Sequence, residues 1–220
     1  MKRLQRGVLI TFEGIDGCGK STLAHGFADT LNQHSFDVVL TKEPGATAVG
    51  KKIRTLVQEE REEILPVAEA LLFAADRAMH INQIVQPALR DHKIVVSDRM
   101  ADSSRVYQGC ARGVDCTRLE NVLEWVMDGT KPDLTFFVEL SIDDAFERMK
   151  DRKQLSRFEQ EARDFHLAVL DGYNALYAGK DHVLRLDGRM TPQELVDEAY
   201  ARTLAWLERQ GLMVHESHNN

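Results

Sequence analysis

The feature of this sequence that most constrains its fold is a short apolar run that leads directly into a glycine-rich loop. Residues 8–12, Val-Leu-Ile-Thr-Phe, have the composition of a buried strand. Residues 14–21, Gly-Ile-Asp-Gly-Cys-Gly-Lys-Ser, match the pattern G-x-x-x-x-G-K-[ST], and a helical pattern runs from Gly19 to about Gln33. The sequence therefore predicts a strand, a phosphate-binding loop and a helix in direct succession.

The loop has the chemistry of a nucleoside triphosphate site. Glycines let the backbone curl so that several N–H groups point at phosphate oxygens, and the helix N-terminus adds the positive end of its dipole. We expect Lys20 to reach the β- and γ-phosphates and Ser21 to hold Mg²⁺. A chance glycine-rich turn is disfavoured, because both the spacing and the flanking elements fit. The residues expected to contact the triphosphate are Gly14, Ile15, Asp16, Gly17, Cys18, Gly19, Lys20, Ser21 and Thr22.

The remaining apolar runs predict a parallel sheet. Further strands are expected at residues 38–40, 94–96, 135–140 and 183–186. Helical patterns separate them, at residues 47–60, at residues 68–90 and from Thr191 until Gly211. Short apolar strands that alternate with longer helices are typical of an α/β fold. We therefore expect a five-stranded parallel sheet flanked by helices in three layers.

Composition limits the classes of protein that remain. The 220 residues, 43% of them hydrophobic, predict a single globular domain over residues 1–220 with a frayed tail at 213–220. The longest apolar run has six residues, whereas a membrane-spanning helix needs about 18, so we expect no membrane partner. A net charge of −7 disfavours general binding to nucleic acid. Three cysteines favour reduced thiols and a cytoplasmic location.

Asp98 and Arg99 are candidates for a second part of the site. They directly follow the expected strand at residues 94–96, and ligands of doubly wound sheets gather at the carboxyl ends of the strands. Asp98 is a candidate to hold Mg²⁺ through water, and Arg99 to bind an acceptor phosphate. The alternative is that Asp98 caps a helix and Arg99 is a solvated neighbour.

A third charged cluster lies at residues 150–157, where four of eight side chains are basic. It is expected to form a lid, at about residues 150–158, that folds over the triphosphate and supplies a cation. The alternative is a solvated basic loop.

Taken together, these motifs resemble those of the thymidylate kinases. The likeness runs from about residue 8 to about residue 207, and it is specific because other nucleotide kinases lack E-P-G and Y-Q-G at these positions. The residues that carry it are the loop at 12–22, Glu43-Pro44-Gly45, Arg54, Phe73, Arg77, Asp98-Arg99, Ser104, Tyr107-Gln108-Gly109, Arg112-Gly113, Pro132-Asp133-Leu134, Arg152 and Arg157-Phe158-Glu159.

The resemblance implies a three-layer P-loop nucleoside monophosphate kinase fold. It also implies the phosphorylation of dTMP to dTDP, in the synthesis of dTTP, by direct in-line transfer from ATP with Mg²⁺. In this family the chain forms a homodimer, so we expect one here.

The resemblance also implies an acceptor site for dTMP. Phe73 would stack on thymine, and Arg77, four residues further on, would reach the base edge; the alternative is that Phe73 is a core residue. Arg54 and Arg99 would clamp the monophosphate, and Asp16 would lie near its sugar and phosphate. The full expected set is Asp16, Glu43, Pro44, Arg54, Phe73, Arg77, Arg99, Ser104, Tyr107 and Gln108.

The phosphate loop has no basic residue in its interior, residues 15–18, whereas the expected lid has Arg152, Lys153 and Arg157. The chain thus resembles the basic-lid type of the family, common in bacteria. The expected catalytic residues are Lys20, Arg152, Asp16 and Arg99, and the expected metal ligands are Ser21 and Asp98.

Four positions, Lys42, Ala46, Met100 and Arg105, depart from the family pattern. Arg105 is expected beside the sugar pocket. These departures leave open a kinase that acts on another deoxynucleoside or nucleotide. An alternative from a different class is a nucleotide-dependent switch or binding module. A switch needs no second phosphate pocket, so the acceptor-site and lid arginines favour the enzyme.

Overall fold

Five parallel strands form the central sheet of the computed structural model, which describes residues 2–59, 63–150 and 155–213. The strand order is β2-β3-β1-β4-β5, and every pairing among the described strands is parallel. The three-layer α/β architecture expected from the sequence is therefore confirmed. The strands are β1 (Val8–Glu13), β2 (Val38–Lys42), β3 (Ile94–Asp98), β4 (Leu134–Glu139) and β5 (Val183–Asp187).

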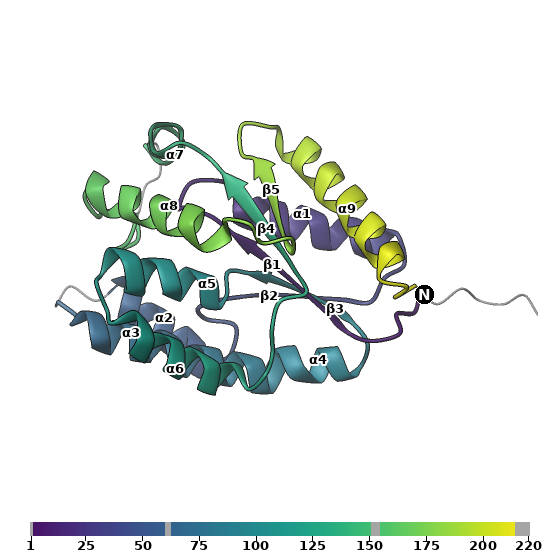
Figure 1. Ribbon diagram of the computed structural model, residues 1–220, viewed down its shortest axis with the longest axis horizontal. Coiled ribbons are helices and arrows are strands. Elements are labelled where there is room, and N and C mark those ends of the chain that lie inside the picture. Colours follow the sequence, from purple (N-terminus) through teal and green to yellow (C-terminus); the bar gives the residue numbers. More distant parts are fainter. Residues whose placement is uncertain (1, 60–62, 151–154, 214–220) are drawn as a thin grey trace, which may run out of the picture.

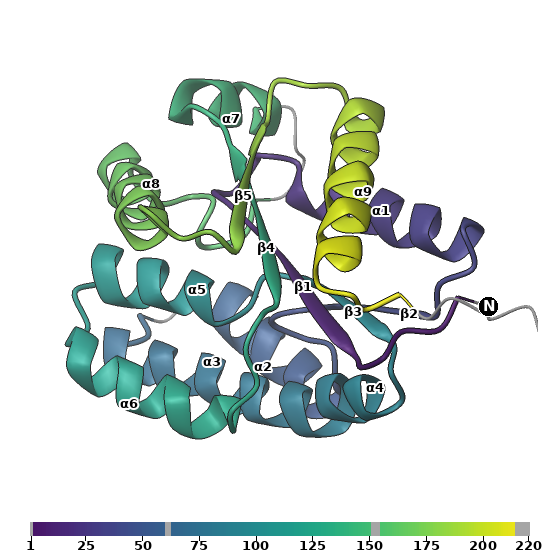
Figure 2. The same ribbon diagram turned by 45° about the vertical axis from the view of Figure 1, so that its right-hand side comes forward.

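Helices cover both faces of this sheet, as Figures 1 and 2 show. On one face α1 (Lys20–Gln33) and α9 (Pro192–Arg209) lie side by side. On the other face lie α3 (Pro66–His80), α4 (Gln86–Arg90) and α6 (Cys116–Met127). The remaining elements are α2 (Ala48–Glu59), α5 (Ala101–Ser104), α7 (Ile142–Met149), α8 (Arg163–Tyr177) and two π-helical segments, η1 (Ile81–Val85) and η2 (Arg105–Ala111).

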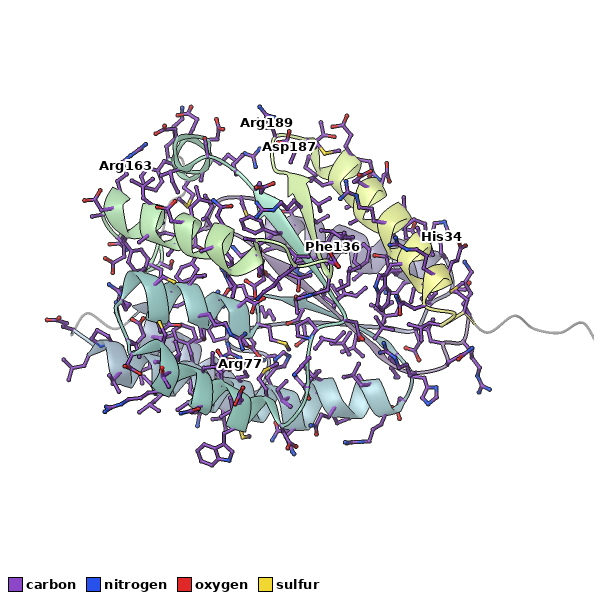
Figure 3. The ribbon with its side chains drawn as sticks, viewed as in Figure 1. His34, Arg77, Phe136, Arg163, Asp187 and Arg189 are labelled. Carbon is purple, nitrogen blue, oxygen red and sulfur yellow. The ribbon has the colours of Figure 1, made fainter. Side chains whose placement is uncertain are left out.

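Aromatic side chains join α1 to the middle of the sheet. Phe27 of α1 packs edge-on against Phe12 of β1, with ring centroids 5.2 Å apart. Phe136 of β4, labelled in Figure 3, stacks on Phe12 at 5.2 Å. All three rings are fully buried, and edge-on and offset contacts are the geometries that aromatic pairs favour. This cluster fixes the helix that follows the phosphate loop onto the strand that precedes it.

The strand register brings the charged motifs to one edge of the sheet. In the pairing of β1 with β3, Phe12 lies opposite Asp98. Because both strands run in the same direction, the loop that follows Glu13 and the turn that follows Asp98 leave the sheet together. Residues more than eighty positions apart thus meet at the carboxyl ends of adjacent strands, where ligands of such folds bind.

Three local expectations differ from the structure. The helix expected at 68–90 consists of α3, η1 and α4, because a π-helical segment interrupts it. Asp98 is the last residue of β3 and the N-cap of α5 is Met100, so the helix-cap interpretation of Asp98 is wrong. Met213, expected to be frayed, pairs with Leu4 in an isolated bridge; residues 214–220 lie outside the described residues. None of the described helices is long and apolar enough to cross a bilayer.

Candidate active site

Gly17 and Gly19 give the phosphate loop a backbone that other residues rarely adopt. Gly19, the N-cap of α1, has φ of 96°. Gly17 has φ of 82°, and a side chain there would meet the carbonyl oxygen of Ala145 at 2.7 Å. Residues with a Cβ rarely adopt such angles, so the glycines permit both the curl and the close approach of α7.

Arg148, to which the sequence analysis gave no contact with the phosphate loop, hydrogen-bonds to the backbone of that loop. Arg148 of α7 donates to the carbonyl of Cys18 at 3.3 Å and to the carbonyl of Gly188 at 2.7 Å. One guanidinium thus joins the phosphate loop to the turn between β5 and α9. Nothing in a local pattern indicates this contact, because its two acceptors are backbone groups 170 positions apart in the sequence.

Asp16 lies at the centre of the charged groups of the site. Its carboxylate accepts from Arg99 at 2.5 Å and from the Tyr107 hydroxyl at 2.9 Å, and Lys20 Nζ lies 3.5 Å away. Burial raises the pKa of Asp16, but the charges of Arg99 and Lys20 outweigh burial and hold its pKa well below the usual range. Asp16 is therefore a carboxylate at neutral pH, and it orients two cations beside the loop.

Arg99 is held in an unusual backbone conformation at the end of β3. Its φ is 73°, in the left-handed region that residues other than glycine seldom adopt. Its N–H donates to the carbonyl of Phe12 at 3.0 Å, and Ser97 Oγ donates to its carbonyl at 2.7 Å. Its guanidinium donates to the carbonyl of Gly14 at 3.1 Å. The interpretation of Arg99 as a solvated neighbour is wrong, because its side chain is mostly buried among these partners.

Ser21 and Asp98 form the part of the site that fits a magnesium ion. Ser21 Oγ donates to Asp98 Oδ2 at 2.5 Å, whereas Asp98 Oδ1 is buried and has no hydrogen-bond partner. A hydroxyl and a carboxylate oxygen are the hard ligands that Mg²⁺ prefers, and it typically takes only one or two protein ligands besides phosphate and water. Among the described residues, no group of three or more His, Cys, Asp or Glu side chains is placed to hold a metal ion. The ligand set expected from the sequence thus fits the ion.

Two adjoining hollows open beside the loop. A cleft of about 290 Å³ is lined by Lys20, Ser21, Arg54, Asp98 and Arg99, among others. A narrower pocket of about 60 Å³ is lined by aromatic and polar side chains, which include Phe73, Arg77, Ser104, Tyr107 and Gln108. Asp16, Glu43, Pro44 and Arg99 line both, so the two hollows form one continuous site. All ten expected acceptor residues line at least one of them.

Phe73 and Phe158 form an aromatic wall of the narrow pocket. Phe73 of α3 is half-buried, and its ring lies edge-on to that of Phe158 at 5.9 Å. Phe158 also contacts the ring of Tyr107, at 6.0 Å. Phe73 packs against the main core as well as lining the pocket, so the two interpretations of this residue do not exclude each other.

Arg77 is fully buried beneath this pocket, in the interior below the sheet (Figure 3). Its Nε donates to Glu43 at 2.8 Å, its Nη1 to Ser104 Oγ at 3.1 Å and its Nη2 to the carbonyl of Met100 at 3.1 Å. His80, which the sequence analysis did not single out, bonds the other Glu43 oxygen at 2.8 Å. Burial raises the pKa of Glu43, but the Arg77 charge and the His80 hydrogen bond lower it overall. The Glu43 carboxylate therefore serves to hold Arg77.

The other expected residues that the structure describes also form hydrogen bonds or ion pairs within the protein. Arg54 donates to the carbonyl of Pro44 at 3.0 Å, and Gln108 donates to Glu69 at 2.9 Å. Arg152 and Lys153 lie outside the described residues. Arg157, the other basic residue of the expected lid, forms an ion pair with Glu69 at 2.5 Å.

Arg105 does not lie where the sequence analysis expects it. Its guanidinium donates to Glu120 at 2.6 and 2.8 Å and to Asp102 at 2.8 Å, and it lines neither hollow. The expectation of a charge beside the sugar pocket is therefore wrong. Met100, which also departs from the family pattern, is buried and packs in an apolar cluster that includes Leu9 and Val95.

The comparisons with known proteins agree with this geometry. A family model described as thymidylate kinase matches residues 12–199. A thymidylate kinase of Halothermothrix orenii is 40% identical over 198 residues, which are 89% of this chain and 95% of that one. One of an Exiguobacterium species is 38% identical over 94% of this chain and 98% of that one. The chain belongs to the thymidylate kinase family.

A solved structure extends this likeness to three dimensions. The crystal structure of thymidylate kinase from Ehrlichia chaffeensis matches with a TM-score of 0.72 and 29% identity, over 90% of this chain and 98% of that one. Membership of the family over nearly the whole chain makes this protein a kinase and supports dTMP phosphorylation. Nothing in the comparisons favours the switch or binding module.

Glu13, at the end of β1, is a buried carboxyl that the sequence analysis left without a role. It accepts from the Met100 N–H at 2.8 Å, from Ser103 Oγ at 2.7 Å and from the Tyr173 hydroxyl at 2.8 Å. Burial and the Asp102 charge raise the pKa of Glu13 from 4.5 to about 7. Glu13 thus braces the turn that carries Arg99, and it titrates near neutral pH.

The raised pKa of Glu13 gives stability a testable pH dependence. Between pH 4.5 and pH 7 the native state binds more protons than the unfolded state, so ionisation of Glu13 destabilises the fold as pH rises. Glu13→Gln removes this titration. We expect the free energy of unfolding of wild type, relative to Glu13→Gln, to fall by at most about 3 kcal/mol between pH 4.5 and pH 8, measured by urea unfolding. If the difference in free energy of unfolding between wild type and Glu13→Gln did not change with pH, this prediction would be wrong.

Proposed function

We propose that the chain transfers the γ-phosphoryl group of ATP directly to the phosphate of dTMP, as a single catalytic domain. The observation that carries this proposal is the Asp16 cluster, in which Arg99 and Lys20 face one carboxylate at 2.5 and 3.5 Å. Lys20 belongs to the phosphate loop, whereas Arg99 lines the pocket expected to hold the acceptor. The cluster therefore supports two phosphate groups bound end to end, as transfer between two nucleotides requires.

On the donor side, the loop N–H groups, the start of α1 and Lys20 would bind the triphosphate. Ser21 and Asp98 would hold Mg²⁺, which neutralises phosphate charge when bound. The buried, unpartnered oxygen of Asp98 supports this role. Arg148 would act indirectly, because its bonds to two backbone carbonyls fix the outer side of the loop.

On the acceptor side, the flat face of Phe73 would stack on thymine, and Arg77 would meet the base edge. The bonds from Arg77 to Glu43 and Ser104 support this role, because a cation with a fixed orientation discriminates better than a mobile one. Tyr107, whose hydroxyl is tied to Asp16, would lie beneath the sugar. Arg54 and Arg99 would bind the monophosphate between them in the wider cleft.

The reaction needs no covalent enzyme intermediate. The nucleophile is a phosphate oxygen of dTMP itself, so the protein has only to position the two substrates and stabilise the charge on the transferring group. The described loop interior, residues 15–18, carries no cation for this purpose. Arg157 is paired with Glu69. Because Arg152 matches the family's lid arginine, we assign this cation to Arg152, with Lys153 and Arg157 as the other basic residues of the expected lid.

We also propose that the chain acts as a homodimer, in the cytoplasm. A hollow of about 450 Å³ lies between α3 and α6, and two apolar side chains that line it are exposed: Leu71 by 53% and Trp125 by 82%. Large exposed apolar side chains that gather at one place on a surface mark interaction sites. A second copy of the chain fits, because a twofold interface pairs one such patch with itself. Cys18, Cys110 and Cys116 are free thiols, which supports a reducing compartment.

The decisive experiment is a coupled assay of ADP formation with ATP, Mg²⁺ and a panel of acceptors: dTMP, dUMP, dCMP, dGMP and thymidine. We expect dTMP to give the highest kcat/KM and Lys20→Ala to abolish turnover with all of them. Lys20 donates to the carbonyl of Ile15 and lies near Asp16, which keeps its ion pair with Arg99, so this variant should keep the wild-type circular-dichroism melt. Equal or better turnover of a competitor would overturn the assignment of dTMP.

Arg152→Ala tests the lid. A cation engaged mainly in the transition state changes kcat far more than KM, so we expect a loss of about 10³-fold in kcat with nearly unchanged dissociation constants for dTMP and ATP. Arg152→Lys should recover only part, because an ammonium cannot bridge two oxygens as a guanidinium does. If Arg152→Ala keeps most of its kcat, this assignment is wrong.

The dimer is tested by Leu71→Asp, which places a charge at the hollow between α3 and α6. We expect wild type to sediment with the mass of two chains and Leu71→Asp with the mass of one. Leu167→Asp is the matched control, because Leu167 is also an exposed leucine on a helix, at 38%, but lies on α8. A wild-type monomer at micromolar concentration would contradict the proposal.

A further inference from the structure

Glu69 is a fully buried carboxylate to which the proposed mechanism gives no role. It lies in the first turn of α3, and its side chain has no exposed surface. A buried carboxylate is destabilising by several kcal/mol unless ion pairs and hydrogen bonds compensate it. Here the compensation comes from side chains of two other segments of the chain, so the position of Glu69 links three parts of the fold.

The partners of Glu69 come from two separate segments of the chain beside the acceptor pocket. Gln108 of η2 donates to Glu69 Oε1 at 2.9 Å, and Arg112 Nε lies 3.6 Å from the same oxygen. Arg157 Nη2 donates to Oε2 at 2.5 Å. Gln108 lines the acceptor pocket, whereas Arg157 belongs to the turn at residues 155–161, which the expected lid overlaps.

The turn at residues 155–161 is itself part of the acceptor pocket. Ser156 and Phe158 line it, and Phe158 contacts the rings of Phe73 and Tyr107. The backbone N–H of Arg157 also donates to the carbonyl of Gln58 in α2, at 3.3 Å. The contacts that hold Arg157 in place therefore also position the next residue, Phe158, and with it the aromatic wall of the pocket.

Arg112 connects Glu69 to the far end of the same turn. Its guanidinium lies over the ring of Phe165 at 4.6 Å, and it also forms an ion pair with Glu161. Glu69 thus holds the turn directly through Arg157, near its start, and indirectly through Arg112, which pairs with Glu161 near its end. One carboxylate on α3 therefore contributes to the position of both ends of the turn.

We propose that Glu69 is a positioning residue that fixes the turn at residues 155–161 against the acceptor pocket, so that binding of the nucleoside monophosphate and placement of the turn depend on each other. This rests on the proposed assignment of the pocket to dTMP. A base stacked beside Phe73 would also contact Phe158, and so would stabilise the turn. Conversely, a turn released from Glu69 withdraws Phe158 from the base.

Glu69→Gln tests this link, because it keeps the shape of the side chain and removes its charge. We expect the KM for dTMP to rise about tenfold, with the dissociation constant for ATP within twofold of wild type. Glu120→Gln is the control. It removes a carboxylate from another arginine, Arg105, outside the pocket, and should change neither constant.

A double-mutant cycle separates positioning from general structural damage. If Glu69 acts through Arg157, then Glu69→Gln combined with Arg157→Met should raise the KM for dTMP by clearly less than the product of the two single effects. Arg157→Lys, which keeps the charge, should restore part of the affinity lost in Arg157→Met. If Glu69→Gln does not fold, the comparison of Arg157→Met with Arg157→Lys decides alone, and equal KM values for the two would overturn the proposal.

Hydrogen exchange supplies a readout of the turn itself. In wild type, saturating dTMP should slow amide exchange in the peptide that covers residues 155–161, and in Glu69→Gln it should not. The role of Glu69 would be overturned if Glu69→Gln and Arg157→Met changed the KM for dTMP independently. It would also be overturned if dTMP still slowed amide exchange at residues 155–161 in a folded Glu69→Gln. An absence of dTMP turnover in wild type would instead contradict the proposed function, so the two failures are distinguishable.

Discussion

The ion pair between Asp16 and Arg99 is the interaction on which the rest of the site depends. Asp16 belongs to the phosphate loop and Arg99 to the turn after β3, so their contact at 2.5 Å joins the two halves of the site. Arg99 also donates to the carbonyl of Gly14, which holds the start of the loop. The left-handed backbone of Arg99 is unfavourable by about 1–2 kcal/mol, and the bonds to Phe12, Ser97 and Asp16 compensate for it.

The parts of this arrangement that follow from the sequence are those with a local cause. The spacing of three glycines and Lys20 predicts the loop, and β-branched runs predict the strands, because both depend on neighbours in the chain. The meeting of Ser21 with Asp98 was also predictable. Parallel strands place their carboxyl ends at one edge, so a residue at the end of β3 must lie near the loop after β1.

The directions of long side chains were not predictable in the same way. Arg105 stands two positions before Tyr107 in the sequence, but in the π-helical segment that it begins its guanidinium turns to Glu120 and Asp102. Closeness in sequence to a pocket residue therefore did not fix the direction of its side chain. The contacts of Arg148 and Glu69 were not predictable for another reason. Arg148 bonds the backbone carbonyls of Cys18 and Gly188, and Glu69 pairs with Arg157, 88 positions away in the sequence. No spacing in the sequence records such contacts.

The buried charges show why these contacts matter more for position than for stability. A buried ion pair contributes little net free energy, because desolvation offsets most of the attraction, yet removal of one partner leaves a charge that nothing compensates. Glu43 with Arg77, Asp16 with Arg99 and Glu69 with Arg157 each join different elements. Apolar packing could hold the same elements together, but it would tolerate small displacements that a hydrogen-bonded pair does not. A site that must bring two phosphate groups into line needs that intolerance. The first two pairs line the site, and the third holds the turn whose Ser156 and Phe158 line it.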